Sequence, residues 1–421
     1  MAEMTPMMQQ YLQIKEQYKD SILFFRLGDF YEMFFDDAKV ASKELELTLT
    51  GRDCGQPERA PMCGVPFHSY ETYAARLVSR GFKVAICEQV EDPAAAKGLV
   101  KRDIIRVITP GTVIEGSMLD EDRNNYLASV YVSNDGKECG LCFCDCSTGE
   151  VQATVLSGAN LSELICNELG RFNPSEIIIN SMADNDAVVR AFMKDKLHGV
   201  CEVRDNAEFD VSSCRSAICE QYAVGDVSLL GLTESSVSVC AIGCAIRYLQ
   251  STQMNGLERL RRPVVYNDAQ YMKLDITARR NLELVETMRS KEKRGSLLGV
   301  LDHTRTAMGK RLMRTWIEQP LINLAAITRR LDGVEELVTG APLRADTRDA
   351  LNGVYDLERI MTRIVYGRAN ARELRSLLQT LEQIPLIKTA LASVRTDILR
   401  EIDRDVDALE DIRALFAGTL R

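Results

Sequence analysis

The sequence contains no uninterrupted apolar run of about 18 residues, so we expect no membrane-spanning helix. Its first residues, Met1-Ala2-Glu3-Met4, lack the basic and then apolar layout of a signal peptide. The chain carries 13 cysteines, an odd number that cannot all pair, and without an export signal this indicates reduced thiols. We therefore predict a cytoplasmic protein with no membrane partner.

An excess of positive charge is also missing. Lys and Arg total 52 against 61 Asp and Glu, a formal net charge of −9, which excludes a uniformly basic nucleic-acid binder. Any contact with DNA must come from local basic patches. The Gly-x-x-x-x-Gly-Lys-Ser/Thr pattern that cradles nucleotide phosphates does not occur, so we expect no ATPase activity and no enzyme in this chain.

Aromatic side chains make up only 6% of the residues, yet six of them fall within the twelve residues 24–35. Residues 22–27 form a short apolar, aromatic run that is typical of a buried strand. Gly28-Asp29 is a turn signal that ends this strand. An extended segment that follows would place Phe30, Glu32 and Phe34 on one face and Tyr31, Met33 and Phe35 on the other.

Phe30 and Glu32 would then project side by side, about 6 to 7 Å apart. A ring and a carboxylate in this arrangement could enter a base stack and hydrogen-bond the edge of a displaced base. Proteins that insert Phe into the minor groove kink the duplex, and the cost is lowest where the pair is already weak. The alternative interpretation is an ordinary aromatic strand whose Glu32 faces water.

Residues 26–34, RLGDFYEMF, resemble the mismatch-reading Phe-x-Glu motif of the bacterial MutS family of DNA mismatch repair proteins. Five further stretches continue the resemblance in family order: PMCGVPFH at 61–68, VAICEQ at 84–89, RVITPGT at 106–112, DITARRNLEL at 275–284 and MGKRL at 308–312. The resemblance covers essentially the whole chain.

This resemblance implies recognition of mismatched or unpaired bases in double-stranded DNA, with Phe30 stacking on the base and Glu32 bonding its edge. The implied partners are DNA with mismatches or small loops and a MutL-type repair protein. The ATPase domain of the family, with its ATP and Mg, and the homodimer contacts would lie beyond residue 421, so the chain resembles an amino-terminal part. An alternative function is a scaffold that docks the MutL-type partner through the connector and has little DNA affinity of its own.

The resemblance also implies a multidomain fold: an α/β mismatch-binding domain, a ribonuclease-H-like α/β connector, and all-α core and lever helices. The expected divisions are a mismatch-recognition domain at 1–115, a linker at 116–125, the connector at 126–252 and an incomplete helical domain at 257–421. In the first domain the residues predict helices at 6–18, 36–45 and 71–79, a turn-rich loop at 51–66 and a strand at 83–87.

A local basic stretch in the first domain could hold backbone phosphates. The predicted contacts are Lys97, Lys101, Arg102 and Arg106, with Arg52 from the loop. The resemblance favours the phosphate role most for Arg106, and it places Met62 near the kinked base step. The alternatives are a solvated strand edge for the basic residues and plain packing for Met62.

Two catalytic interpretations of the connector fail on geometry. On a strand, Cys142, Cys144 and Cys146 stand too far apart for one tetrahedral zinc ion, so with Cys139 they are better explained as small buried hydrophobes on one face. A two-metal nuclease needs clustered carboxylates, and Asp145 alone does not supply them. We predict no metal site and no cofactor in this chain.

The remainder reads as helices. The predicted helices are 278–285, 309–318, 324–338, 356–365, 371–381, 385–391 and 398–416. Trp316, the single tryptophan, is expected in the core, and the positively charged run 279–294 is expected to be a solvated face or part of a structural core rather than a DNA contact.

Overall fold

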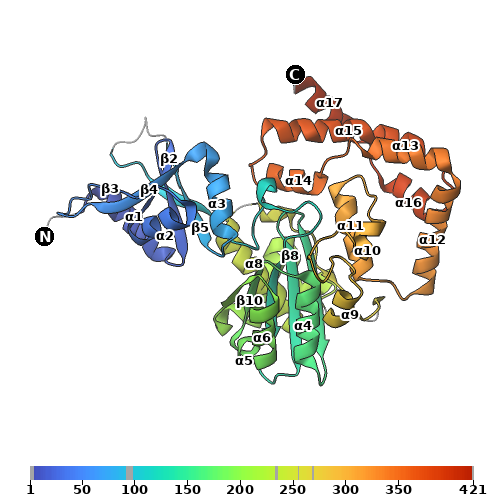
Figure 1. Ribbon diagram of the computed structural model, residues 1–421, viewed down its shortest axis with the longest axis horizontal. Coiled ribbons are helices and arrows are strands. Elements are labelled where there is room, and N and C mark those ends of the chain that lie inside the picture. The colour runs from blue at the N-terminus through green and yellow to red at the C-terminus, as the bar shows by residue number, and fades with distance from the viewer. Residues whose placement is uncertain (1–3, 92–97, 233–235, 255, 268–269, 420–421) are drawn as a thin grey trace.

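The computed structural model describes residues 4–91, 98–232, 236–254, 256–267 and 270–419. Three parts follow one another along the chain (Figure 1): an α/β domain coloured blue, a second α/β domain coloured green, and a helical region coloured orange to red. The predicted order of an α/β region followed by helices is therefore confirmed. No helix in these described ranges is both long and apolar enough to cross a membrane.

The first domain is built on a six-stranded sheet with the order β3-β4-β2-β1-β5-β6. Only β1 and β5 pair in parallel among the pairs that make this sheet, and the remaining ladders are antiparallel. The strands are β1 Ser21–Leu27, β2 Phe30–Phe34, β3 Thr50–Arg52, β4 Ala60–Pro66, β5 Lys83–Gln89 and β6 Arg102–Ile108. Residues 51–66, predicted as a loop, therefore contain the strand β4 and most of β3.

Alternation along β1 divides the apolar residues of this domain between two faces of the sheet. Phe25 packs with Tyr11 of helix α1 Pro6–Gln17, whereas Phe24 packs with helices α2 Phe35–Leu45 and α3 Tyr70–Val78. Neighbouring strand residues point to opposite faces, so a continuous apolar run buries both sides of the sheet. The three helices begin and end within two residues of the predicted bounds.

The second domain has another six-stranded sheet, ordered β11-β10-β7-β8-β9-β12. The strands are β7 Leu127–Val132, β8 Glu138–Asp145, β9 Glu150–Ser157, β10 Glu176–Ile179, β11 Val200–Val203 and β12 Val264–Val265. One face packs against α4 Leu161–Phe172, α5 Ser181–Asn185 and α6 Ala187–Lys196, and the other against α7 Val211–Tyr222 and α8 Ser236–Gln253. The sheet is thus covered on both sides.

The four cysteines of β8 and its end were expected to be buried on one face. All four are buried, but they do not share one face. Cys142, Cys144 and Cys146 belong to the cluster under α7 and α8, whereas Cys139 packs on the opposite side. The odd residue spacing explains the difference, because side chains alternate along a strand. The Sγ atoms of Cys142 and Cys144 lie 3.6 Å apart, and burial raises the pKa of the Cys139 thiol.

The helical region differs from the sequence prediction in several places. Its helices are α9 Ile276–Asn281, α10 Leu297–Leu301, α11 Ala307–Glu318, α12 Leu324–Thr339, α13 Ala341–Leu351, α14 Leu357–Val365, α15 Ala371–Leu391, α16 Asp397–Asp405 and α17 Glu410–Thr419. Helices α10 and α13 were not predicted, and α9 ends four residues before the predicted end at residue 285. Helix α15 continues through Pro385, and the helix expected at 398–416 is divided into α16 and α17. Trp316 is 37% exposed rather than core, with the Arg330 guanidinium 3.8 Å from its ring centroid.

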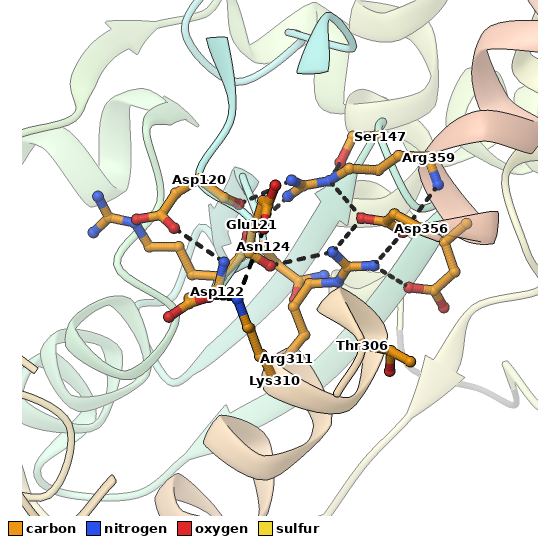
Figure 2. A network of polar contacts seen from close by, with 12 residues as sticks. Asp120, Glu121, Asp122, Asn124, Ser147, Thr306, Lys310, Arg311, Asp356 and Arg359 are labelled. Atoms are coloured by element: carbon orange, nitrogen blue, oxygen red, sulfur yellow. Dashed lines mark hydrogen bonds and ion pairs between the residues drawn. The ribbon is translucent and has the colours of Figure 1, made fainter. Parts of the chain in front are cut away.

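Residues 116–125, predicted as a linker, are bound by the helical region (Figure 2). Arg359 of α14 is 6% exposed, and its Nη1 and Nη2 donate to the carbonyls of Asp120 and Arg123, both at 2.9 Å. Its Nε donates to Ser147 Oγ of the second domain at 3.2 Å. The segment is therefore part of an interdomain contact, because one buried guanidinium holds its backbone against both neighbours.

Candidate nucleic-acid interface

Phe30 lies at the first position of β2, directly after the Gly28-Asp29 turn. Gly28 has φ +59°, a left-handed conformation that glycine adopts without steric cost. The turn brings Phe30 opposite Leu27 in the β1–β2 ladder. The Phe30 side chain is 46% exposed, whereas Phe34 on the same face is fully buried against the Tyr11 ring of α1. The uncovered end of β2 thus presents one aromatic ring to solvent.

Glu32 lies two residues farther along β2, on the face that carries Phe30, so the predicted alternation is observed over the first four residues of the strand. Its Oε2 accepts a hydrogen bond from Arg52 Nη1 of β3. The Glu32 and Arg52 side chains are 16% and 39% exposed. The carboxylate is therefore neither buried without a partner nor free in solvent, because one arginine neutralises it.

Gly64 of β4 faces Glu32 across the ladder and provides the space that the carboxylate occupies. A Cβ added at Gly64 would lie 3.4 Å from Glu32 Cγ and 3.3 Å from the Tyr31 carbonyl oxygen. The distance to the Tyr31 oxygen is shorter than most ordinary contacts, and the distance to Glu32 Cγ is at their short limit, so a larger residue would press first on the Tyr31 backbone. This explains a glycine in the PMCGVPFH stretch.

A second exposed aromatic side chain, which the sequence analysis did not single out, lies beside Phe30. Pro66 is the cross-strand partner of Phe30, and the Phe67 that follows it is 38% exposed. The Phe67 amide donates to the Asp29 carbonyl at 2.9 Å. The Arg26 guanidinium stacks 3.8 Å from the Phe67 ring centroid, an attractive cation–π geometry. The sequence signal that could have identified Phe67 is its position directly after Pro66 in a turn-rich segment.

Arg26, which stacks on Phe67, also contacts the neighbouring strand β5. Its Nη1 pairs with Glu88 Oε1 of β5 at 3.2 Å, and Glu88 also accepts from the Tyr31 hydroxyl. Burial, with the negative charge of Glu88 adding to it, raises the pKa of Tyr31. The turn that presents Phe30 is therefore braced by an ion pair and a neutral phenol.

Met62 of β4 packs inside the domain. It pairs with Phe34 and with Thr50 in the two flanking ladders, and its partly buried side chain belongs to the cluster under α1. The structure therefore favours packing as the role of Met62.

The predicted phosphate-binding residues do not form one patch. Lys97 lies outside the described residues, and Lys101 has an exposed side chain at the start of β6. Arg102 is only 7% exposed. Its Nε donates to the Arg26 carbonyl at 2.8 Å, its Nη1 donates to Gln10 Oε1 at 3.0 Å, and burial lowers its pKa. Arg102 therefore supports the end of β1 from inside the domain.

Arg106 is 3% exposed, and this burial argues against the phosphate role predicted for it. Its guanidinium forms an ion pair with Glu115, and its Nη2 donates to the Thr112 carbonyl at 3.0 Å. Burial acts to lower the pKa of Arg106, but the charge of Glu115 raises it overall. A guanidinium enclosed in this way has no donor left facing solvent-side phosphates. Of the arginines predicted here, only Arg52 combines an exposed side chain with a site next to Glu32.

Comparison with known proteins identifies three consecutive matches. The family model for MutS domain I matches residues 5–117, that for MutS domain II residues 125–261, and that for MutS domain III residues 277–416. Proteins named DNA mismatch repair protein MutS are similar over nearly the whole chain. That of Ruminiclostridium cellulolyticum is 49% identical over 98% of this chain, that of Acetivibrio thermocellus 47% over 98%, and that of Alkaliphilus oremlandii 45% over 100%. The chain spans 47–48% of the length of these curated relatives.

Proposed function

This chain belongs to the MutS family, and from that premise we propose that its first domain recognises mismatched or unpaired bases in double-stranded DNA during mismatch repair. The observation that carries the proposal is the half-exposed Phe30 at the uncovered end of β2, with Glu32 on the same face. A phenyl ring that supports little core is available to enter a base stack. Unstacking is cheapest at a mispair, so the ring selects weak steps in the duplex.

Glu32 supplies the second part of the selection. A carboxylate close to DNA phosphates is repelled, so its approach is favourable only where a displaced base offers a hydrogen-bond donor. A correctly paired base has its Watson–Crick donors occupied and offers no such compensation. The stacking of Phe30 and the bond from Glu32 therefore favour the same substrate, a base that has left its pair.

We propose that backbone phosphates are held by the exposed basic side chains, Arg52 and Lys101, with Lys97 as the sequence suggests. Such contacts position the duplex without reading its sequence. Arg102 and Arg106 are left out of this set because their guanidinium groups are bound inside the domain.

The family also suggests partners and activities for the whole protein. We propose a MutL-type partner for the second domain, a homodimer for the full-length protein, a DNA-dependent ATPase activity with ATP and Mg in its other half, and a cytoplasmic location. No side chain in the described ranges groups with others into a metal site of at least three His, Cys, Asp or Glu.

The decisive experiment is a titration of this chain against a mismatched duplex and a matched duplex of the same length, at one stated salt concentration. We expect tighter binding to the mismatched duplex. Equal and weak binding to both duplexes would instead favour the scaffold function, in which the chain docks a repair partner and has little DNA affinity of its own. Salt must be held constant because phosphate contacts make affinity steeply salt-dependent.

A further inference from the structure

The carboxylate that we propose to read the displaced base already has a partner within the protein. Glu32 Oε2 accepts from Arg52 Nη1, and the Glu32 carboxylate has no other hydrogen-bond partner among the described residues. The pair lies at the surface, with Arg52 more exposed than Glu32. Glu32 must therefore release Arg52, or share it, before it can accept a hydrogen bond from a base.

Arg52 differs from the other arginines of this region in how it is held. Arg102 donates to the Arg26 carbonyl and to Gln10, and Arg106 is enclosed with Glu115. The Arg52 side chain, in contrast, has Glu32 as its one hydrogen-bond partner in the described part of the chain, and it is 39% exposed. It can therefore change partners without breaking the fold of the domain.

We propose that Arg52 is a specificity-determining residue, which masks Glu32 until a displaced base offers a donor and then transfers its guanidinium to a DNA phosphate. This inference rests on the proposed function of Phe30 and Glu32. The exchange breaks one charge-assisted hydrogen bond and forms two, from Arg52 to a phosphate oxygen and from the base to Glu32. A guanidinium suits both partners because its planar donors bind a carboxylate or a phosphate equally well.

The exchange is unfavourable on a matched duplex. There the bases offer Glu32 no donor, so releasing Arg52 would leave an uncompensated carboxylate near the phosphates. Arg52 consequently stays paired with Glu32. The neutral pair reduces the repulsion between Glu32 and the phosphates but adds no favourable contact with the DNA. Masking thus reduces the repulsion on a matched duplex, and it affects discrimination only when Glu32 is present.

The test compares R52Q, E32Q and the double variant for binding to matched and mismatched duplexes at one salt concentration. In R52Q the unmasked Glu32 carboxylate repels the phosphates of the matched duplex, so the affinity for that duplex falls. On the mismatched duplex the variant loses the Arg52–phosphate contact, but Glu32 no longer has to release Arg52 before it binds the base, so the affinity changes less. We expect the ratio of mismatched to matched affinity to rise roughly two- to tenfold, the size expected for one contacting ion pair. In the E32Q background we expect R52Q to weaken both duplexes equally and to leave the ratio unchanged within about twofold.

R59Q is the matched control, because Arg59 is an exposed arginine that lies just before β4. It should leave the ratio unchanged, and melting curves should show all the variants folded. An R52Q variant that weakens both duplexes by the same factor while Glu32 is present would overturn the inference and leave Arg52 as a plain backbone contact. A wild-type chain without any mismatch preference would overturn the proposed function and this inference together, whereas a preserved preference that R52Q does not alter would overturn the inference alone.

Discussion

Arg106 and Glu115 form an enclosed ion pair, with 4% and 3% of their side chains exposed. The pair sits where the chain leaves β6 and turns toward the second domain. There the Gly111 amide donates to Glu176 Oε2 of β10 at 2.9 Å, and the Thr109 hydroxyl donates to the same carboxylate. The RVITPGT stretch is therefore the joint between the two α/β domains, held by one carboxylate on each side.

Replacement of Arg106 by Gln should destabilise the first domain by about 3–5 kcal/mol, because Glu115 would remain buried without its counter-charge. Urea unfolding followed by a probe in this domain measures the loss. R80Q is the control, since the Arg80–Glu44 pair is exposed and should contribute less than about 1 kcal/mol. Equal effects of R106Q and R80Q would contradict a structural role for Arg106.

Glu176 should make the stability of the joint fall as pH rises. Burial raises the pKa of Glu176 above its ordinary value, although Thr109, Tyr248 and Gly111 donate hydrogen bonds to it. A carboxyl group with a raised folded-state pKa stabilises the fold below its unfolded pKa of about 4.3 and loses this contribution as pH rises through the folded value. The free energy of unfolding of E176Q relative to wild type should therefore increase with pH across that interval.

The free energy of unfolding of E115Q relative to wild type should change with pH in the opposite direction to that of E176Q. Burial acts to raise the pKa of Glu115, but Arg106 outweighs it and the pKa is lowered overall. The ionised Glu115 therefore stabilises the fold above the ordinary pKa of Glu, and this contribution disappears as pH falls through the lowered value. Unfolding measurements at several pH values should show the two variants diverging from wild type in opposite directions. Differences that do not vary with pH would contradict both assignments.

Phe30→Ala should abolish the preference for mismatched DNA and spare the fold. Loss of base stacking should cost about 1–3 kcal/mol of binding to the mismatched duplex, whereas salt-dependent binding to either duplex should persist. Stability should fall by about 1 kcal/mol or less, because the ring is 46% exposed. L49A, at 47% exposure in the same domain, controls for the loss of an exposed apolar side chain. A variant destabilised by about 3–5 kcal/mol that still prefers mismatches would rule out the wedge.

Arg359→Ala should release residues 116–125 from the helical region. The change removes the hydrogen bonds to the Asp120 and Arg123 carbonyls and to Ser147, so the backbone amides of this segment should exchange hydrogen faster. R123A is the control, since the Arg123 side chain is 56% exposed and its one ion pair among the described residues is a surface pair with Asp120. Exchange in this segment that is the same in R359A and R123A would contradict the anchoring role.

Local sequence was sufficient to predict the strand 22–27, the Gly28-Asp29 turn and the alternation that puts Phe30 and Glu32 on one face. These features depend on neighbouring residues, because a glycine turn and a period of two act within a few positions. The helices of the first domain were predicted for the same reason, from capping residues and an apolar period along one segment. The exposure of Phe30 needed the structure, since it depends on which distant elements cover each end of β2.

Contacts between segments that are distant in sequence determined the features that local sequence did not predict. Strands β3 and β4 lie in a segment rich in turn residues, and they are strands because β4 pairs with β2. Pro385 does not end α15, because tertiary packing of Leu381 and Ile384 before the proline and of Leu391 after it holds the helix together. A propensity for turns or helix ends is weak compared with these contacts.

The arginines of the first domain show most clearly the difference between what local sequence predicts and what tertiary packing determines. Arg52, Arg102 and Arg106 are chemically identical, and the sequence suggested the same phosphate role for all three. The fold places Arg52 beside Glu32 at the surface, Arg102 against the end of β1, and Arg106 against Glu115 in the interior. A guanidinium binds whichever acceptor the fold brings within about 3 Å, and that acceptor is set by packing between segments that are distant in sequence.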